Sequence, residues 1–198
     1  MDKVMNSIGF SKKLVVDAKN TAGGLCLMWK SSVSISLVDF SKDLIAVKVS
    51  DAIYNWILVG FYRPSYASKK KMAWENLFVL LESIHIPWVC VGDINFTTSE
   101  DEKFGGKKGS FSQKNYLQEL IFEFGVIDLG FLGSKFTWAK GRRCNSAIKR
   151  RLDKAIASMV WRLAYPKATI SHLRAIRSNH TPILLDSNSV TSFAHRPF

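Results

Sequence analysis

Cysteine is scarce in this sequence, and the few cysteines lie far apart. The 198 residues include three, Cys26, Cys90 and Cys144, with no Cys-x-x-Cys pair. This odd, scattered set argues against a disulfide scaffold or a structural zinc site and favours reduced, mostly buried thiols. Long apolar runs are also missing, since none approaches the ~18 residues of a membrane-spanning helix. The N-terminus lacks a signal-peptide pattern, so we expect an intracellular protein, in the nucleus or cytoplasm, with no membrane partner.

Acidic residues are few relative to basic ones. The chain has 28 lysines and arginines against 16 aspartates and glutamates, a net charge of +12. Such an excess is typical of a protein that binds polyanions. The basic residues also cluster, and those that we expect to contact nucleic acid are Lys107, Lys108, Arg142, Arg143, Lys149, Arg174 and Arg177. The alternative is a generic solvated basic surface, because charge alone names neither a substrate nor a reaction.

The spacing of apolar residues predicts strands mixed with a few helices. Short or alternating apolar segments predict strands at Leu25–Trp29, Val33–Leu37, Leu44–Val49, Trp56–Tyr62, Trp88–Val91, Phe136–Trp138, Leu152–Ala157, Ala168–Leu173 and Ile183–Leu185. Helical spacing predicts one helix over Ala67–Ile84 and a second whose buried face carries Tyr116, Leu117, Leu120, Ile121 and Phe124. Residues 95–110 read as a polar loop. The mixture predicts an α/β fold in one domain, residues 1–186, followed by an unstructured tail, residues 187–198.

Polar motifs follow several of these predicted strands, where functional side chains of α/β proteins tend to lie. They are Gly92-Asp93-Ile94-Asn95, Arg151-Leu152-Asp153-Lys154 and Ser178-Asn179-His180-Thr181-Pro182. Taken singly, each has an ordinary structural interpretation as a turn, a salt-bridge partner or a structural histidine. Individually they are weak evidence of function.

Together and in this order, the motifs resemble those of the endonuclease/exonuclease/phosphatase family, which includes DNase-I-like nucleases. The resemblance runs from about Lys12 to the C-terminus. Ala22-Gly23-Gly24-Leu25, Asp128-Leu129-Gly130-Phe131 and Phe136-Thr137-Trp138 are similar to the plant branch of LINE-type non-LTR retrotransposons. The resemblance implies a two-sheet α/β sandwich that here lacks its first strand or strands.

The resemblance also implies roles at a phosphodiester-cleaving site. Asp93 would align and deprotonate the attacking water, and Asn95 would bind that water or a phosphate oxygen. His180 would contact the scissile phosphate, while Asp153 would accept the other ring N–H of His180. Tyr62 would lie beside the phosphate. Mg²⁺ would be the cofactor and DNA the partner, with RNA as an alternative, and the chain would act as a monomer.

The sequence departs from the family pattern where a metal would bind. The first glutamate is Glu75, inside a predicted helix, so the metal-binding glutamate of the family has no counterpart. Asn179 stands where the family has the aspartate of Ser-Asp-His. An uncharged amide is a weaker ligand for a hard cation than a carboxylate. We therefore expect an N-terminally truncated endonuclease domain with weak or no activity.

Two alternatives to an impaired nuclease stay open at this point. The fold could persist only as a non-catalytic surface that binds nucleic acid. It could also serve a phosphatase or phosphoinositide hydrolase of the same superfamily, although the retrotransposon-like segments and the basic clusters argue against this.

Overall fold

The structure is a computed structural model that describes residues 5, 7–17, 24–51, 54–64, 67–106, 116–141 and 147–189. Lys107, Lys108, Arg142 and Arg143 lie outside the described residues, as do residues 190–198 of the expected tail. The chain divides into two units, Met1–Asn95 and Phe96–Phe198. In the part of the chain that is described, no helix is long and apolar enough to cross a membrane.

The first unit is organised around a sheet whose strands follow the predicted apolar segments. Strands β3 (Ser34–Phe40), β4 (Leu44–Ser50) and β5 (Asn55–Tyr62) pair antiparallel, and β6 (Trp88–Asp93) pairs parallel to β5. Five of the seven residues of β4 are buried, including all of residues 44–47. A strand covered on both faces needs a continuous apolar run rather than alternation, and residues 44–47 provide one.

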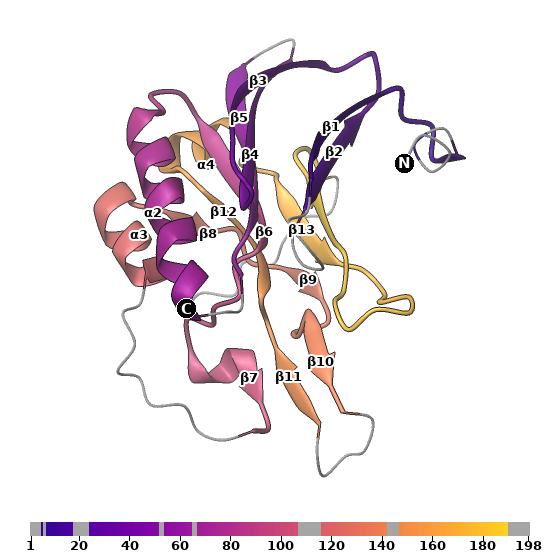
Figure 1. Ribbon diagram of the computed structural model, residues 1–198, viewed down its shortest axis with the longest axis vertical. Helices are drawn as coiled ribbons and strands as arrows, with labels where there is room; N and C mark the ends of the chain where they lie inside the picture. The colour runs from indigo at the N-terminus through magenta and orange to yellow at the C-terminus, as the bar shows by residue number, and fades with distance from the viewer. Residues whose placement is uncertain are drawn as a thin grey trace. The chain divides into compact units, whose positions relative to one another are not determined.

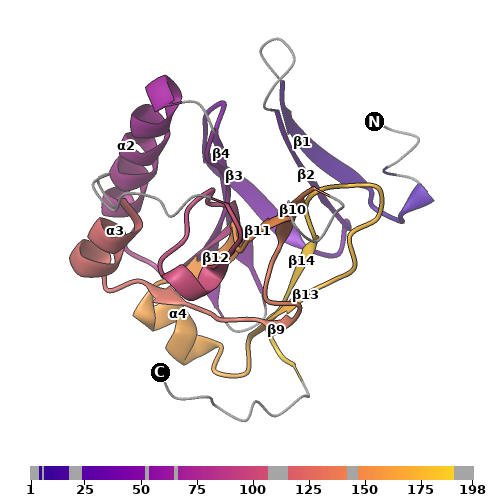
Figure 2. The ribbon, with the colours of Figure 1, turned by 90° about the horizontal axis from the view of Figure 1, so that it is seen from below.

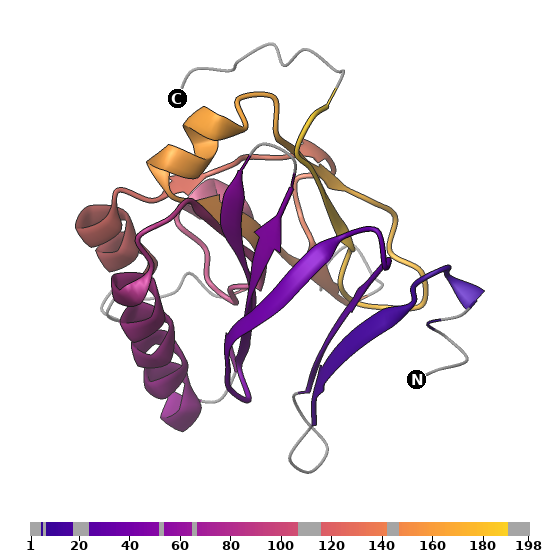
Figure 3. The ribbon, with the colours of Figure 1, turned by 90° about the horizontal axis from the view of Figure 1, so that it is seen from above.

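Different elements cover the two faces of this sheet (Figure 3). Helix α2 (Ala67–Ser83) lies along one face, where the Trp74 ring lies 5.5 Å from that of Phe61. Strands β1 (Lys12–Val16) and β2 (Leu25–Trp29) pair antiparallel, and their apolar side chains pack against a core cluster in β4. The members of that cluster are Ile45, Val47 and Val49. The predicted helix and strands of this unit are therefore confirmed.

Burial differs from expectation at β3 and β2. Leu37 lies in an alternating apolar segment, a pattern typical of a half-buried strand, but Leu37 itself is 47% exposed. β3 pairs with β4, and a register shift between Leu37 and Asp39 interrupts its alternation. Cys26, expected to be a buried thiol, is exposed, whereas Cys90 is fully buried, and burial raises the pKa of its thiol far above the usual range. Neither of these cysteines forms a disulfide.

The second unit contains several short paired strands. Its strands are β7 (Lys103–Phe104), β8 (Ile127–Asp128), β9 (Leu132–Gly133), β10 (Trp138–Lys140), β11 (Ile148–Arg150), β12 (Asp153–Ala157), β13 (Thr169–His172) and β14 (Ile183–Asp186). β11 lies between β10 and β7, as Figure 1 shows. β13 lies between β14 and β9 (Figure 2), and β12 pairs with β8. The predicted segments over β12, β13 and β14 are confirmed.

Helices α3 (Tyr116–Phe124) and α4 (Met159–Ala164) supply much of the second core. Leu117 and Leu120 of α3 are buried as predicted, but Ile121 is 42% exposed. The sequence did not predict α4, which Ser158 caps by accepting a hydrogen bond from the Trp161 backbone. The predicted loop over residues 95–110 also contains a short 3₁₀ helix, Glu100–Glu102, and β7.

Candidate active site

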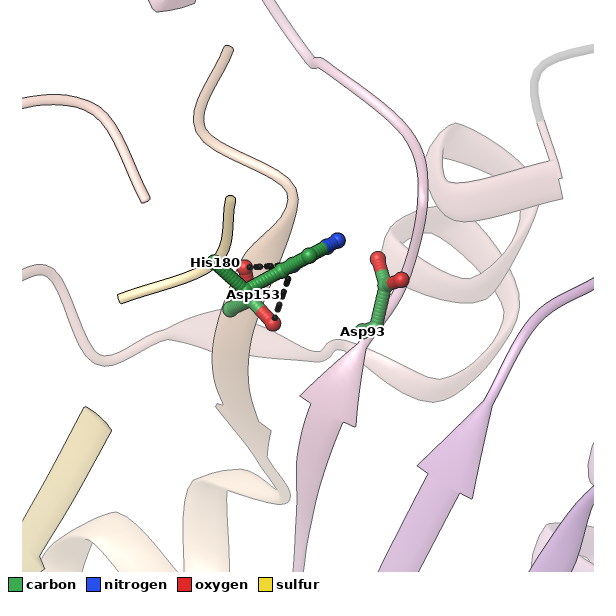
Figure 4. Close-up of side chains that lie close together, drawn as sticks. All are labelled: Asp93, Asp153 and His180. Carbon is green, nitrogen blue, oxygen red and sulfur yellow. Dashed lines mark hydrogen bonds and ion pairs between the residues drawn. The ribbon is translucent and has the colours of Figure 1, made fainter. Parts of the chain in front are cut away.

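In the first unit, the Gly-Asp-x-Asn motif forms a tight turn at the end of β6. Gly92 has φ +150, and a Cβ built there would lie 2.0 Å from the carbonyl oxygen of Phe61, so only glycine fits. The Asp93 carboxylate accepts a hydrogen bond from the Asn95 backbone N–H at 2.9 Å. Asn95 has φ +49, a left-handed conformation that asparagine tolerates well. The turn fixes where both side chains leave the strand, and Figure 4 shows Asp93 there.

Two residues from β5 and the segment after it lie beside this turn. Tyr62 is the register partner of Asp93 across the β5–β6 pair, so the two predicted residues lie side by side. Arg63 is 5% exposed, and its guanidinium donates to the carbonyl of Asn95. The Arg63 backbone N–H also donates to the Asp93 carbonyl at 2.9 Å. Arg63 was not among the residues predicted from the sequence, and its position between Tyr62 and Pro64 at a strand end was the available signal.

In the second unit, Asp153 and His180 form a hydrogen-bonded pair. His180 Nδ1 lies 3.0 Å from Asp153 Oδ2 and 3.3 Å from Oδ1. Asp153 begins β12, whereas His180 precedes β14, 27 residues later in the chain. The other ring nitrogen of His180 points away from Asp153 (Figure 4). The side chain of His180 is 39% exposed and that of Asp153 is 15% exposed, so the imidazole can meet a ligand while the carboxylate holds it.

Thr137 forms hydrogen bonds with the backbone next to both Asp153 and His180. Its fully buried side-chain oxygen accepts hydrogen bonds from the backbone N–H groups of Leu152 and Asp153, each at 3.0 Å. Its backbone carbonyl accepts from Thr181 N–H at 2.7 Å, next to His180. One residue therefore holds the segments that carry Asp153 and His180. Its signal in the sequence was a polar residue between Phe136 and Trp138, both of which are partly buried here.

The remaining predicted residues of this unit lie on its surface. Asn179 is exposed, and its backbone carbonyl accepts a hydrogen bond from Ala139 N–H at 3.0 Å. Arg174 and Arg177 are exposed in the segment between β13 and β14. Lys149 is exposed on β11, with its ammonium 5.8 Å from the centre of the Phe104 ring.

A cluster of buried charges flanks Asp153 in the sequence. The Arg151 guanidinium donates to both carboxylate oxygens of Asp128, at 2.7 and 2.8 Å, and to Glu102 at 2.8 Å. The ammonium of Lys154, which is fully buried, donates to Glu102. Glu102 also accepts from the Thr98 backbone N–H at 2.6 Å. Because successive strand side chains point to opposite faces, Lys154 anchors β12 from the side opposite Asp153.

Burial and charge pairing act in opposite directions on the titration of this cluster. Burial alone would raise the pKa of the Asp128 carboxyl, but the hydrogen bonds and charge of Arg151 outweigh it and lower that pKa. Asp128 therefore favours the folded state at neutral pH, and this contribution is lost as the pH falls through its folded pKa. Burial lowers the pKa of the Lys154 ammonium, and the charge of Arg151 lowers it further.

Sequence comparison does not place this chain in a family. No family model matches it. No curated protein matches it either.

Several solved structures are similar to this chain over most of its length. The endonuclease domain of TRAS1, a telomere-specific non-LTR retrotransposon, is similar with a TM-score of 0.65 and 14% identity, covering 88% of this chain and 79% of that one. An endonuclease/exonuclease/phosphatase family protein from Leptotrichia buccalis gives a TM-score of 0.57 at 10% identity, covering 93% and 75%. Truncated TDP2 from Caenorhabditis elegans gives 0.55 at 14% identity, covering 92% and 76%.

At such low identity these likenesses show the fold. The chain is a mixed α/β protein with several sheets, and its fold is the sandwich of the endonuclease/exonuclease/phosphatase type. The α/β sandwich expected from the sequence is thereby confirmed.

Proposed function

We propose that this chain is a metal-dependent phosphodiesterase that cleaves DNA, of the kind found in the endonuclease domains of LINE-type non-LTR retrotransposons. In this proposal the catalytic roles fall to Asp93, Asn95 and Tyr62 of the first unit and to Asp153 and His180 of the second. The observation that carries the proposal is the Asp153–His180 pair, in which a carboxylate holds a partly exposed imidazole at 3.0 Å.

The Asp153–His180 pair would stabilise the negative charge that develops on the phosphoryl group in the transition state. Asp153 accepts from Nδ1–H, which fixes the ring orientation and stabilises the protonated imidazole. The remaining ring nitrogen then donates to a non-bridging phosphate oxygen. A donor that is already oriented before the reaction stabilises the transition state without further rearrangement.

Asp93 and Asn95 would act on the attacking water. The Asp93 carboxylate takes the proton from water as its oxygen attacks phosphorus, and the Asn95 amide holds the water or a phosphate oxygen. The bond from phosphorus to the leaving oxygen breaks in the same step. The turn at Gly92 restricts both side chains, since the Asn95 amide also donates to the Arg63 carbonyl at 3.4 Å.

The available donors suit a hard divalent cation. Asp93 offers a carboxylate and Asn179 an amide oxygen, and Mg²⁺ prefers oxygen ligands. When bound, Mg²⁺ would neutralise charge on the phosphate and the leaving oxygen. With Asn179 in place of a carboxylate this pair carries a single negative charge, so we propose weak Mg²⁺ binding and slow cleavage.

Restoring the missing charge should accelerate nicking. We expect Asn179→Asp to raise the rate at which supercoiled plasmid is nicked in Mg²⁺ by about tenfold or more, because a second carboxylate strengthens metal binding. Asn188→Asp is the matched control, since it adds the same charge at another exposed position in this unit. Equal rates for the two variants would contradict the assigned role of Asn179.

Removing the imidazole should abolish whatever nicking is present. We expect His180→Ala to slow nicking by at least about 100-fold, the usual loss when one oriented donor is removed. His85→Ala, at an exposed position in the first unit, is the control and should nick like the wild type. Nicking that survives in His180→Ala would refute the proposal.

A non-catalytic role as a nucleic-acid-binding protein is the second candidate. The exposed Lys149, Arg174 and Arg177 favour it, because binding to phosphates needs only positive charge. A solved TDP2 from D. rerio, similar with a TM-score of 0.53, is complexed with single-strand DNA product, which supports DNA as the partner. Retention of plasmid or RNA without nicking would favour this candidate. Release of phosphate from small phosphoesters alone would favour a phosphatase.

A further inference from the structure

Arg63 is a buried cation at the end of β5. It directly follows the strand, between Tyr62 and Pro64, and is only 5% exposed. Burying a guanidinium costs free energy unless its N–H groups and its charge find partners. A residue that merely ended the strand would not need this cost, because uncharged residues adopt the extended conformation that precedes a proline. The contacts of Arg63 are therefore the best guide to its role.

Arg63 and Asn95 hold each other through hydrogen bonds that run in opposite directions. The Arg63 guanidinium donates to the backbone carbonyl of Asn95, and the Asn95 side-chain amide donates to the backbone carbonyl of Arg63 at 3.4 Å. The Arg63 backbone N–H also donates to the Asp93 carbonyl at 2.9 Å. Arg63 is thus tied to the turn after β6 at two residues, through its backbone at Asp93 and mainly through its side chain at Asn95.

The backbone of Asn95 is held from both sides. Its φ of +49 lies in the left-handed region, which asparagine tolerates but does not prefer. On one side, its N–H donates to the Asp93 carboxylate at 2.9 Å. On the other, its carbonyl accepts from the Arg63 guanidinium. The two bonds together stabilise the conformation that sets the direction in which the Asn95 side chain leaves the chain.

The bond to the Arg63 carbonyl also orients the Asn95 amide group. A side-chain amide carries two N–H donors and one carbonyl oxygen in fixed relation to one another. Because one N–H is engaged by Arg63, the direction of the second N–H and of the oxygen is determined. Arg63 therefore controls both where the Asn95 side chain begins and how its polar atoms are turned.

We propose that Arg63 is a positioning residue of the nuclease site, acting through Asn95. Being buried, it does not meet the substrate itself. It holds the Asn95 amide where that group would bind the attacking water or a phosphate oxygen. A misplacement of about 1 Å, caused by a change away from the chemistry, can cost about 100-fold in rate. The inference rests on the proposed function for what Asn95 binds, whereas the hold of Arg63 on the turn can be tested without any activity.

Two substitutions of Arg63 separate hydrogen bonding from packing. Arg63→Met fills much of the same space but cannot donate, whereas Arg63→Lys keeps a donor and the positive charge. Ile57→Val is the matched control for lost stability. Ile57 is 4% exposed and lies in β5, toward the end of the strand opposite Arg63, so its shortening weakens the core without touching the turn.

The first measurement is the NMR spectrum of the full chain with ¹³C,¹⁵N-labelled asparagine, in which Asn95→Ser identifies the Asn95 signals. We expect Arg63→Met to move the Cα and Cβ signals of Asn95 away from values typical of a left-handed residue, and to shift its side-chain amide signals. Arg63→Lys should move them less, and Ile57→Val should leave them in place. Unmoved Asn95 signals in Arg63→Met, or equal movement in the Met and Lys variants, would overturn the inference.

A measurement on the wild type alone covers the case in which Arg63→Met does not fold. In a chain with ¹⁵N-labelled arginine, a guanidinium held by hydrogen bonds rotates slowly and gives separate, slowly exchanging Nη–H signals. Loss of a signal in Arg63→Lys identifies those of Arg63. We expect Arg63 to show such signals, and a freely rotating Arg63 guanidinium would overturn the inference.

The second measurement is plasmid nicking in Mg²⁺, made in the Asn179→Asp background so that a reduced rate can be followed. Per folded molecule, we expect Arg63→Met to lower kcat by about tenfold to 100-fold while KM stays within about twofold. Arg63→Lys should recover part of the loss, and Ile57→Val should match its parent. Equal kcat for Arg63→Met and its parent would refute the positioning role.

The two measurements separate this inference from the nuclease proposal. If neither the wild type nor Asn179→Asp nicks plasmid, the nuclease proposal fails, and the catalytic purpose of Arg63 fails with it, while the Asn95 signals still show whether Arg63 holds the turn. If nicking depends on His180 but the Asn95 signals do not respond to Arg63, the nuclease proposal stands and the role assigned to Arg63 is refuted.

Discussion

Replacing Glu102 by glutamine is expected to lower the free energy of unfolding by about 3–5 kcal/mol. Glu102 is 5% exposed and accepts from Arg151 and from the fully buried ammonium of Lys154. Glutamine keeps the shape but removes the negative charge, so the buried ammonium of Lys154 keeps only the Asp128 carboxylate, 3.7 Å away, as an anionic partner. Urea unfolding followed by fluorescence measures the change. Glu100→Gln is the matched control, because Glu100 lies in the same 3₁₀ helix with a side chain 55% exposed, and it should cost less than about 1 kcal/mol.

A second substitution separates a charge effect from a packing effect. Adding Lys154→Met to Glu102→Gln removes the cation that has lost its closer carboxylate, and it leaves the bidentate Arg151–Asp128 pair intact. Because replacing a buried ion pair by apolar groups is often nearly neutral, the double variant should recover most of the lost stability. Equal stability of Glu100→Gln and Glu102→Gln would contradict the account of this cluster.

Gly92→Ala is expected to destabilise the protein by about 3–5 kcal/mol. Its φ of +150 is accessible essentially to glycine alone, and an added Cβ would lie 2.0 Å from the Phe61 carbonyl oxygen, which is backbone and cannot move aside. The pairing of Phe61 with Gly92 and of Tyr62 with Asp93 would therefore be disrupted. Thermal and urea unfolding measure the loss.

Gly60→Ala is the control for a methyl group added to the same pair of strands. A Cβ at Gly60 meets only the Ile45 carbonyl, at 3.9 Å, which is an ordinary contact. We expect a change of less than about 1 kcal/mol. A similar loss for both variants would mean that any added side chain disturbs the sheet, and that the turn at Gly92 is not special.

Local sequence pattern predicted the elements that bear the candidate site. β5, β6 and β12 are apolar segments ended or begun by polar residues, and α2 has one apolar stripe, so periodicity is sufficient to place them. The end of predicted strand β6 also marked the motif Gly92-Asp93-Ile94-Asn95 as a candidate. There the Asp93 carboxylate accepts a hydrogen bond from the backbone N–H of Asn95 in the same turn. Such a bond is compatible with either a structural or a catalytic aspartate.

The interactions that hold the site depend on residues distant in sequence, which periodicity does not reveal. Glu102 and Lys154 are 52 positions apart, and the sequence placed Glu102 in a polar loop. Thr137 bonds the backbone of Asp153, 16 positions later. The exposure of Leu37 and of Cys26 was likewise not visible in the local sequence pattern. These features follow from tertiary packing rather than from local pattern.

The central claim is that Asp93 and Asn95 act on the same phosphate as Asp153 and His180. A crystal structure of the full chain with a short DNA duplex and Mg²⁺ tests it most directly. The account predicts that the Asn95 amide and the outer ring nitrogen of His180 both lie within about 3.5 Å of one phosphate or of its attacking water. Contact of the two side chains with separate phosphates, or of only one of them with DNA, would contradict it.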